Sequence, residues 1–502
     1  MSLSVVYTRS ISGIDAPLIT VEVHLANGLP SFSIVGLPET SVKESKDRVR
    51  AAILNSRFEF PARRITVNLA PADIPKEGSR FDLAIAIGLL SASEQLQSCH
   101  LDQYEFIGEL ALGGELRGVK GVLSASIQAR NAQRILCLAN TNTHEARLVS
   151  DAQLIGCDNL LEICAHLTGQ TRLPFISASA PKEQFSDSNN LDEVIGQEHA
   201  KRALEIAAAG EHNLLMIGPP GTGKTMLASR LASLLPKMSE KQALETAAIF
   251  SISSQGFSTS QWRQRPFRAP HHTSSAVALV GGGSVPKPGE ISLSHNGVLF
   301  LDELPEFERR VLDVLREPLE SGKIIISRAA RQAEYPARFQ LITAMNPCPC
   351  GYLGEPSGRC HCTSEQITRY RSRVSGPLLD RIDMHIEVPR LSQQQIHQGR
   401  QKRQTTSQDV RQRVILAREK QLTRCNTSNA HLSPKEITQH CQLKIEDIVL
   451  LEQAVEHLQL STRAYYRILK VARTIADLAG EKNIERHHLA EAISYRRIDR
   501  QV

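Results

Sequence analysis

The residues from Gly218 to Thr225 read Gly-Pro-Pro-Gly-Thr-Gly-Lys-Thr, which is the composition and spacing of a loop that binds phosphate groups. The glycines let backbone N–H groups close around the phosphates, and the N-terminus of the following helix adds a positive dipole end. We expect Lys224 to reach the β- and γ-phosphates of a nucleotide and the Thr225 hydroxyl to bind Mg²⁺. The predicted nucleotide contacts are Gly218, Pro219, Pro220, Gly221, Thr222, Gly223, Lys224 and Thr225.

Two carboxylates and an amide further along the chain could turn nucleotide binding into hydrolysis. Asp302 and Glu303 directly follow the apolar run 298–301. Asp302 can hold Mg²⁺ through its water shell, and Glu303 can orient and polarise the attacking water. Asn346 ends another apolar run, 339–345, and can hydrogen-bond that water or the γ-phosphate. Together with the loop, these groups predict an enzyme that hydrolyses ATP with Mg²⁺.

The elements around these residues predict an α/β fold built from several domains. The run 214–217 before the loop is expected to be a buried strand, and 226–235 after it a helix. The chain is long enough for about three domains. We expect four segments: an α+β domain, a Ser- and Pro-rich linker, a nucleotide-binding α/β core with inserted hairpins, and a basic connector followed by a helical lid. Their predicted limits are 1–172, 173–190, 191–390 and 391–502.

Two arginines complete the predicted nucleotide site. Arg381 precedes the predicted strand 385–388, and Arg463 opens a helix of the lid. An isolated arginine is usually a surface ion-pair former. Here the phosphate loop, the Asp-Glu strand, the Asn strand and the two arginines follow one another in the order typical of AAA+ ATPases, which the chain resembles. The resemblance implies that Arg381 is an arginine finger that acts on the ATP of a neighbouring subunit, and therefore that the protein forms a homo-hexameric ring.

Longer motifs narrow the resemblance to one family. The segments 266–275, 288–292, 301–307 and 326–329 resemble the magnesium-chelatase-like AAA+ family, and 346–351 (Asn-Pro-Cys-Pro-Cys-Gly) is similar to its bacterial YifB/ComM branch. The resemblance covers essentially the whole chain. It implies a cytoplasmic, ATP-driven DNA helicase that promotes branch migration of recombination intermediates in natural transformation. It also implies single-stranded and branched DNA as partners, together with a recombinase or other recombination proteins.

Basic residues in two predicted hairpins bear on DNA binding. The segment 321–335 is expected to form a hairpin that carries Lys323, Arg328 and Arg331, and in related motors this hairpin lines a central pore. A glycine-rich element that ends at Lys287 resembles the second inserted hairpin of the group. Cationic loops of this kind give sequence-independent affinity for the phosphate backbone, which weakens with salt. The alternative is a solvated hairpin with scattered charge.

Four cysteines lie close together in the sequence after Asn346. Cys348 and Cys350 are followed, after nine residues, by Cys360 and Cys362. In a reducing cytosol such a group favours structural Zn²⁺ over disulfides, although each pair has one intervening residue rather than the usual two to four. Reduced thiols packed in a loop remain the alternative.

The N-terminal domain resembles the proteolytic domain of Lon proteases. The segment 76–82 falls where Lon carries its nucleophilic serine, and Lys120 falls where it carries the partner lysine. By that alignment the serine position is held by Arg80, with Ser79 one residue away. Because a Ser–Lys dyad needs its hydroxyl and amine within hydrogen-bond reach, we expect a domain without peptidase activity that contacts DNA or assembles the ring.

Composition restricts the remaining functions. The 502-residue chain carries a formal net charge of +6, which permits a nucleic-acid partner without requiring one. Its apolar runs are too short to span a bilayer, and its start does not resemble a signal segment, so we expect a cytoplasmic protein. The main alternative function is a magnesium-chelatase-type remodelling motor that acts on a protein partner. A Lon-type protease and a DNA-binding scaffold with a vestigial ATPase are disfavoured by Arg80 and by the complete set of nucleotide-site residues, respectively.

Overall fold

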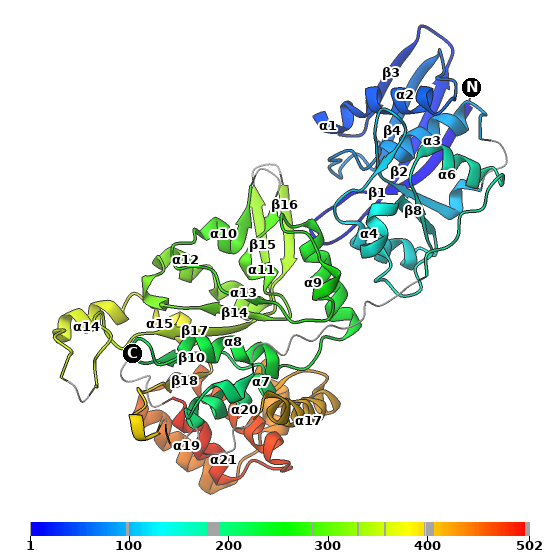
Figure 1. Ribbon diagram of the computed structural model, residues 1–502. Helices are drawn as coiled ribbons and strands as arrows, with labels where there is room; N and C mark the ends of the chain where they lie inside the picture. The colour runs from blue at the N-terminus through cyan, green and yellow to red at the C-terminus, as the bar shows by residue number, and fades with distance from the viewer. Residues whose placement is uncertain are drawn as a thin grey trace. The chain divides into compact units, whose positions relative to one another are not determined.

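The computed structural model describes residues 2–96, 100–177, 190–283, 286–328, 331–355, 358–395, 397 and 406–496. The chain divides into two compact units (Figure 1). Unit 1 comprises Met1–Gln184 and Glu240–Trp262, and unit 2 comprises Phe185–Ser239 and Arg263–Val502. Residues 178–189, which are most of the predicted linker, and residues 396 and 398–405 of the predicted basic connector lie outside the described residues.

Unit 1 is built on a seven-stranded mixed sheet in the order β3-β4-β2-β1-β5-β8-β9. Its antiparallel part joins β1 to β2 and β2 to β4, and the other neighbours are parallel. The strands of the sheet are β1 (Ser2–Arg9), β2 (Leu18–Ala26), β3 (Ser31–Val35), β4 (Arg64–Ala70), β5 (Tyr104–Ile107), β8 (Ile135–Ala139) and β9 (Leu154–Cys157), and a small hairpin pairs β6 (Glu109–Leu110) with β7 (Leu116–Arg117).

The helices of unit 1 are α1 (Thr40–Lys43), α2 (Ser45–Asn55), α3 (Asp82–Ala92), α4 (Val122–Asn131), α5 (Thr143–Ala146), α6 (Leu160–Leu167) and α9 (Glu240–Ile252). Of these helices, α3, α4, α5 and α6 contact the sheet, and α9 contacts α4. Helix α3 is buried along almost its whole length because it packs on β1 and β2. Gly88 permits this close approach, since a Cβ atom there would lie 2.7 Å from Cγ2 of Val23.

Unit 2 contains a five-stranded sheet in the order β11-β14-β17-β10-β18, with every neighbouring pair parallel. The strands are β10 (Leu214–Ile217), β11 (Phe267–Arg268), β14 (Val298–Leu301), β17 (Gln340–Met345) and β18 (Met384–Glu387). All residues of β10, β14 and β17 are buried, as expected for parallel strands covered on both faces. Because the register pairs Ile217 with Met345 and Leu301 with Thr343, the carboxyl ends of these three strands meet at one edge.

Helices lie on both faces of this sheet (Figure 1). The described helices of unit 2 are α7 (Glu198–Gly210), α8 (Lys224–Leu234), α10 (Ala276–Val280), α11 (Glu290–Leu293), α12 (Arg309–Asp313), α13 (Arg316–Ser321), α14 (Ser364–Arg371), α15 (Gly376–Leu379), α17 (Ser407–Cys425), α18 (Pro434–His440), α19 (Ile445–Leu458), α20 (Thr462–Ala479) and α21 (Arg486–Ser494). The helices α17 to α21 follow the last strand of the sheet in the sequence. The helical character predicted for the C-terminal region is confirmed. The apolar face of α20 is buried through Ile468, Leu469, Ala472, Ile475 and Ala476.

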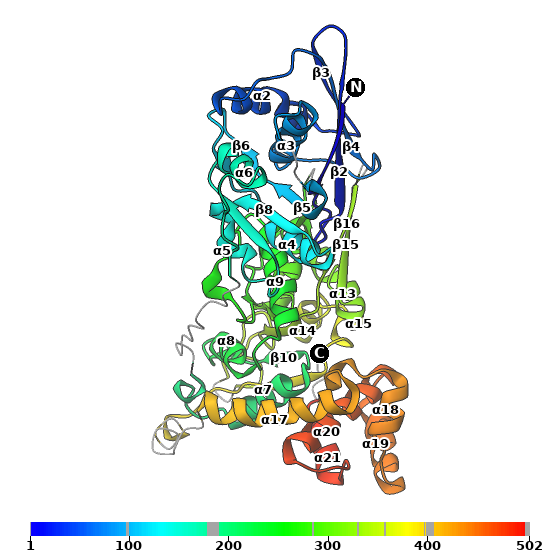
Figure 2. The same ribbon diagram turned by 90° about the vertical axis from the view of Figure 1, so that its right-hand side faces the viewer.

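Two hairpins are inserted between the strands of unit 2. One pairs β12 (Gly281–Gly282) with β13 (Lys287–Pro288), and the other pairs β15 (Lys323–Arg328) with β16 (Arg331–Pro336). The β15–β16 hairpin stands away from the sheet on the side opposite the C-terminal helices (Figures 1 and 2). The mixed α/β fold with a parallel core is therefore as predicted. No helix among the described residues is long and apolar enough to cross a membrane.

Candidate nucleotide site and cysteine cluster

The phosphate loop connects β10 to α8, as the sequence predicts. Gly221 and Gly223 have φ angles of +76° and +86°, which other residues rarely adopt. Gly218 is required for a different reason, because a Cβ atom there would lie 2.2 Å from the carbonyl oxygen of Val388. The loop thus combines left-handed turns with a close backbone contact, and Lys224 becomes the first residue of α8.

The candidate site forms where β10, β14 and β17 end. Lys224 Nζ donates hydrogen bonds to the carbonyl oxygens of Gly218 (2.7 Å) and Pro219 (2.9 Å) and to Oδ1 of Asn346 (3.2 Å). Thr225 Oγ1 donates to Oδ2 of Asp302 at 2.6 Å. Residues far apart in the sequence are therefore in direct contact at the edge of a parallel sheet, where open α/β folds bind ligands.

The charged groups at this edge include the ammonium group of Lys224 and two carboxylates. Burial lowers the pKa of Lys224, and the nearby carboxylates of Asp302 and Glu303 act in the opposite direction. Oxygen ligands from Thr225 and Asp302 are of the type that Mg²⁺ prefers. Their direct hydrogen bond shows that the two oxygens already face each other, so the residues fit the metal that the sequence predicts.

Glu303 has an environment that was not predicted. Its backbone is left-handed, with φ +51° and ψ +47°, and its N–H donates to Oδ1 of Asp302 at 2.9 Å. Oε2 of Glu303 lies 3.2 Å from Nδ1 of His272, whose ring contacts those of His271 and Phe307. The sequence feature that could have indicated this contact is the His271-His272 pair within the motif 266–275, for which the sequence predicted no role.

Arg381 and Arg463 converge on one carboxylate. Arg381 Nη2 lies 2.6 Å from Oε1 of Glu320, at the end of α13, and Nη2 of Arg463 lies 3.6 Å from the same oxygen. Arg381 is buried and also donates from Nη1 to the carbonyl oxygen of Pro377 at 2.7 Å. The two predicted arginines are thus neighbours, and the same carboxylate, that of Glu320, pairs with both of them.

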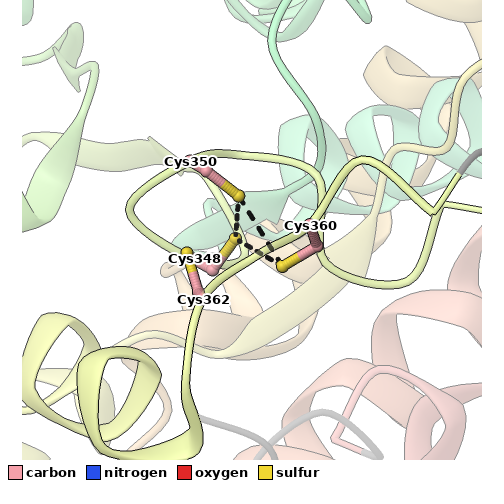
Figure 3. Close-up of side chains that lie close together, drawn as sticks. All are labelled: Cys348, Cys350, Cys360 and Cys362. Atoms are coloured by element: carbon pink, nitrogen blue, oxygen red, sulfur yellow. Dashed lines mark hydrogen bonds between the residues drawn. The ribbon is translucent and has the colours of Figure 1, made fainter.

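The four cysteines converge as the sequence predicts. The Sγ atoms of Cys348, Cys350, Cys360 and Cys362 all lie within 4.8 Å of one another. Figure 3 shows Cys348, Cys350 and Cys360 joined in a triangle, with Cys362 beside Cys348. The sulfur of Cys348 lies 3.3 Å from that of Cys350 and 3.7 Å from that of Cys360, and the sulfurs of Cys350 and Cys360 are 3.6 Å apart. A tetrahedral site with Zn–S bonds of about 2.3 Å separates its sulfur atoms by about 3.8 Å, so these thiols fit a zinc ion.

The loop that carries these cysteines contacts the phosphate loop. Gly351 has a φ angle of +84°, and a Cβ atom there would lie 2.8 Å from Cδ of Pro220 and 3.8 Å from Cγ of Asn346. The sequence did not predict this contact. It places a residue adjacent to one thiol directly against the predicted nucleotide site.

The basic residues predicted to contact DNA lie on the two hairpins. Lys323 is exposed and paired across its hairpin with Glu334 at 3.1 Å, which offsets part of its charge. Lys287 is also exposed. The hairpins are joined because Tyr335 Oη donates to the carbonyl oxygen of Pro286 at 2.7 Å. The side chains of Arg328 and Arg331 lie outside the described part of the structure.

The Lon-like serine and lysine positions are occupied by structural contacts. Ser79 Oγ donates to Glu109, and Lys120 Nζ donates to the carbonyl oxygen of Ser253 at 3.3 Å. Arg80 donates from Nη2 to the carbonyl oxygen of Lys120 at 3.3 Å, whereas its Nε and Nη1 have no hydrogen-bond partner among the described residues. Burial lowers the pKa of Arg80 to about 10.

Comparisons with known proteins agree with this geometry. Three family models match the chain: subunit ChlI of Mg-chelatase over residues 21–142, magnesium chelatase subunit ChlI over 190–396, and the ChlI C-terminal region over 404–496. The chain is 56% identical to "Competence protein ComM" of Haemophilus influenzae, covering 99% of this chain and 98% of that protein. It is 54% identical to "Uncharacterized protein YifB" of Escherichia coli, covering 100% of this chain and 98% of that protein.

A more distant relative is a Lon protease. "Lon protease 2" of Bacillus subtilis is 25% identical over 199 residues, which is 35% of this chain and 36% of that protein.

Proposed function

This chain belongs to the magnesium chelatase ChlI family of AAA+ proteins, in the group that includes ComM and YifB, and on that premise we propose that it is an ATP-driven DNA motor. The motor is a homo-hexameric ring in the cytoplasm that moves branched DNA and promotes branch migration of recombination intermediates. The name of the relative from Haemophilus influenzae supports a role in competence, and hence in natural transformation with recombination proteins as partners.

The observation that carries the ATPase part of the proposal is the contact network at the sheet edge. Lys224 binds the β- and γ-phosphates after it exchanges its carbonyl partners for phosphate oxygens. Thr225 and Asp302 hold Mg²⁺, which when bound neutralises charge on the phosphates. Two residues that already share a hydrogen bond need little rearrangement for this task.

Hydrolysis needs a base and an orienting amide. Glu303 accepts a proton from the attacking water, while Asn346 hydrogen-bonds that water or the γ-phosphate. His272 Nδ1 lies 3.2 Å from Oε2 of the Glu303 carboxylate. We assign the proton of the attacking water to the other oxygen, Oε1.

Arg381 and Arg463 serve the ATP of a neighbouring subunit. Arg381 stabilises the negative charge that develops on the transferred phosphoryl group, as an arginine finger does. Both arginines pair with Glu320 in the single chain, so assembly of the ring would exchange this carboxylate for phosphate oxygens. The exchange makes hydrolysis depend on assembly.

The two joined hairpins are the DNA-contacting elements of the proposed ring. Lys287 and Lys323, with Arg328 and Arg331, supply positive charge for the phosphate backbone. The hydrogen bond between Tyr335 and Pro286 makes the hairpins one unit, so a load on one of them is transmitted to the other.

We also infer that the four thiols hold one structural Zn²⁺ ion. The sulfur separations among Cys348, Cys350 and Cys360, 3.3 to 3.7 Å, are close to those of a tetrahedral thiolate site and exceed the S–S bond length of about 2.05 Å in a disulfide, and the sulfur of Cys362 lies within 4.8 Å of the other three. All of the described cysteines are free. A site closed by four protein ligands has no open position for catalysis.

ATP hydrolysis and strand displacement on three-stranded DNA test the motor proposal. We expect hydrolysis that DNA stimulates, displacement that requires ATP, and loss of both in Lys224→Ala. Hydrolysis that ignores DNA, with no strand moved, would overturn the DNA part of the proposal and leave the ATPase part intact.

One observation favours a second candidate, a remodelling motor of the magnesium chelatase type. All three family models that match the chain are named for a chelatase subunit. Such a motor would hydrolyse ATP in response to a protein partner rather than DNA, so the same ATPase assay with and without DNA separates the two.

A further inference from the structure

The loop that carries the four thiols is held by turns, side-chain hydrogen bonds and an ion pair between Arg390 and Glu355 at 3.8 Å rather than by regular secondary structure. Its described part, 346–355 and 358–363, contains no regular helix or strand between the end of β17 and the start of α14. A turn closes from the N–H of Gly351 to the carbonyl oxygen of Cys348 at 3.0 Å, and Arg371 donates to the carbonyl oxygen of Pro347 at 3.1 and 3.0 Å. Of the four cysteines only Cys348 is buried, so apolar packing contributes little to holding the far side of the loop.

This loop reaches the nucleotide site at two points. Asn346, two residues before Cys348, accepts a hydrogen bond from Lys224 Nζ at 3.2 Å. Gly351, the residue after Cys350, lies so close to Pro220 that a Cβ atom would be 2.8 Å from its ring. Two thiols therefore lie in the sequence between two contacts with the phosphate loop.

Asn346 directly follows the buried strand β17, which holds it, so the position of the thiols bears mainly on the contact of Gly351 with Pro220. Pro220 has a ring that can be pushed only as a rigid body, together with the backbone of the phosphate loop. The amide of Asn346 fixes the ammonium group of Lys224 from the other side. A small displacement of the cysteine loop would thus change the cradle that receives the phosphates.

We propose that the metal-bound cysteine cluster is a brace for the phosphate loop, so that metal occupancy of the four thiols controls the affinity of the nucleotide site. The metal class is a thiophilic divalent ion, with Zn²⁺ as the expected occupant. Loss of the metal frees the side of the loop held by Cys360 and Cys362, and Gly351 then no longer supports Pro220. The proposal rests on nucleotide binding at Gly218–Thr225 and is independent of any action on DNA.

The first test uses the full chain and measures the Kd of a fluorescent ADP analogue with Mg²⁺ in excess. One sample is treated with a zinc chelator, which is then removed, and another is left untreated. The zinc content of each is quantified on a separate portion, from which a thiol reagent releases the bound metal. We expect one zinc ion per chain and a Kd at least about tenfold higher in the stripped protein, restored by added Zn²⁺. A stripped protein that binds ADP as tightly as the loaded one would overturn the brace, as would a chain that takes up no zinc.

Cysteine variants give the same test without a chelator. The double variant Cys360→Ser/Cys362→Ser should lose zinc and bind ADP about as weakly as the stripped protein. Cys425→Ser is the matched control, because this half-buried thiol lies outside the cluster. We expect it to keep both zinc and ADP affinity.

A glycine pair keeps the proposal testable if the stripped protein fails to fold. Gly351 and Gly354 lie in the same loop with φ angles of +84° and +83°, but a Cβ atom at Gly354 would have no neighbour within 4 Å. Gly351→Ala should keep its zinc and weaken ADP binding by about tenfold relative to Gly354→Ala, because only the former pushes on Pro220. Equal ADP affinity in the two zinc-loaded variants would overturn the proposal. Wild-type protein that binds neither ATP nor ADP would instead refute the proposed function itself.

Discussion

The two sheets of this protein both carry residues that could perform chemistry, and they use them differently. In unit 2, the parallel strands β10, β14 and β17 end together, so Lys224, Asp302 and Asn346 contact one another or the phosphate loop. In unit 1, Ser79 and Lys120 are each bound to a different structural partner, Glu109 and the carbonyl oxygen of Ser253. The presence of suitable residue types is therefore a weaker guide to a site than the way the strands end.

Burial makes the same distinction. Lys224 and Arg80 are both nearly inaccessible, with 8% and 4% of their surface exposed. Lys224 has three hydrogen-bond acceptors, whereas Arg80 has one and leaves Nε and Nη1 without a partner among the described residues. A buried cation with several acceptors is held ready for an anion, while a poorly paired one destabilises the fold.

The largest expected effect comes from Arg381, the arginine proposed to act on the ATP of a neighbouring subunit. Arg381→Ala should lower kcat for ATP hydrolysis by about 10³-fold, because the transition-state charge on a neighbouring subunit's phosphates loses its partner. The measurement is steady-state ATPase activity of the assembled protein. Mixing Arg381→Ala with Lys224→Ala subunits should recover part of the activity, since some interfaces then contain both intact groups. Recovery would fail if Arg381 acted within its own subunit.

Removal of the base ranks second. Glu303→Gln should lower kcat by about 10²-fold or more and leave ADP binding unchanged, because the amide keeps the shape of the side chain but cannot accept the proton. ATPase rate and nucleotide affinity are measured on the same preparation. Equal losses in rate and affinity would show that Glu303 has a structural task instead.

His272 should have a smaller effect on the same step. His272→Ala should lower kcat by about tenfold without changing KM, since it loses the contact that orients Oε2 of Glu303. His272→Asn, which keeps a hydrogen-bond donor, should recover much of the rate. His271→Ala should have a smaller effect than His272→Ala, because it removes a ring beside His272 but leaves the contact between His272 and Glu303.

In unit 1 we expect a substitution that improves the protein by raising its stability, whereas the substitutions above impair its activity. Arg80→Met should raise the stability of the protein by about 1 kcal/mol, because it removes a buried guanidinium whose nitrogens are largely unpaired. Thermal unfolding measures the change, and ATPase activity should stay at the wild-type level. Destabilisation by this substitution would mean that Arg80 has a partner in the assembled protein.

The smallest expected effect is none at all. Ser79→Ala should change neither ATP hydrolysis nor the degradation of an unfolded protein substrate, because the hydroxyl is bound to Glu109 and is not paired with Lys120. A peptidase activity that is present in the wild type and absent from this variant would show that unit 1 also carries a catalytic site, which contradicts the comparison of the two sheets.

Local sequence patterns predicted the strands and the nucleotide loop closely. The strand 214–217 has the predicted limits because a short apolar run before the loop can only be buried. The contact between Thr225 and Asp302 also follows, since both residues are defined by their positions relative to strands. The roles of these residues, the DNA contacts and the domain limits stay predictions.

Contacts between loops could not be predicted in this way. The pairing of His272 with Glu303 and the approach of Gly351 to Pro220 depend on the paths of two loops through space. The packing of Glu240–Trp262 with unit 1 is a similar case, because this segment lies between strands of unit 2 in the sequence. Its contact with α4 includes a hydrogen bond from the N–H of Gly121 to Oγ of Ser251 at 3.1 Å.

The left-handed backbone at Glu303 has a consequence for the evolution of this protein. A residue with a side chain costs about 1 kcal/mol in that conformation, and glycine avoids the cost. Glu303→Gly should therefore make the chain more heat-resistant while it removes the base. Variants selected for thermal stability alone should therefore lose Glu303 early, whereas variants selected for both thermal stability and ATP hydrolysis should keep it.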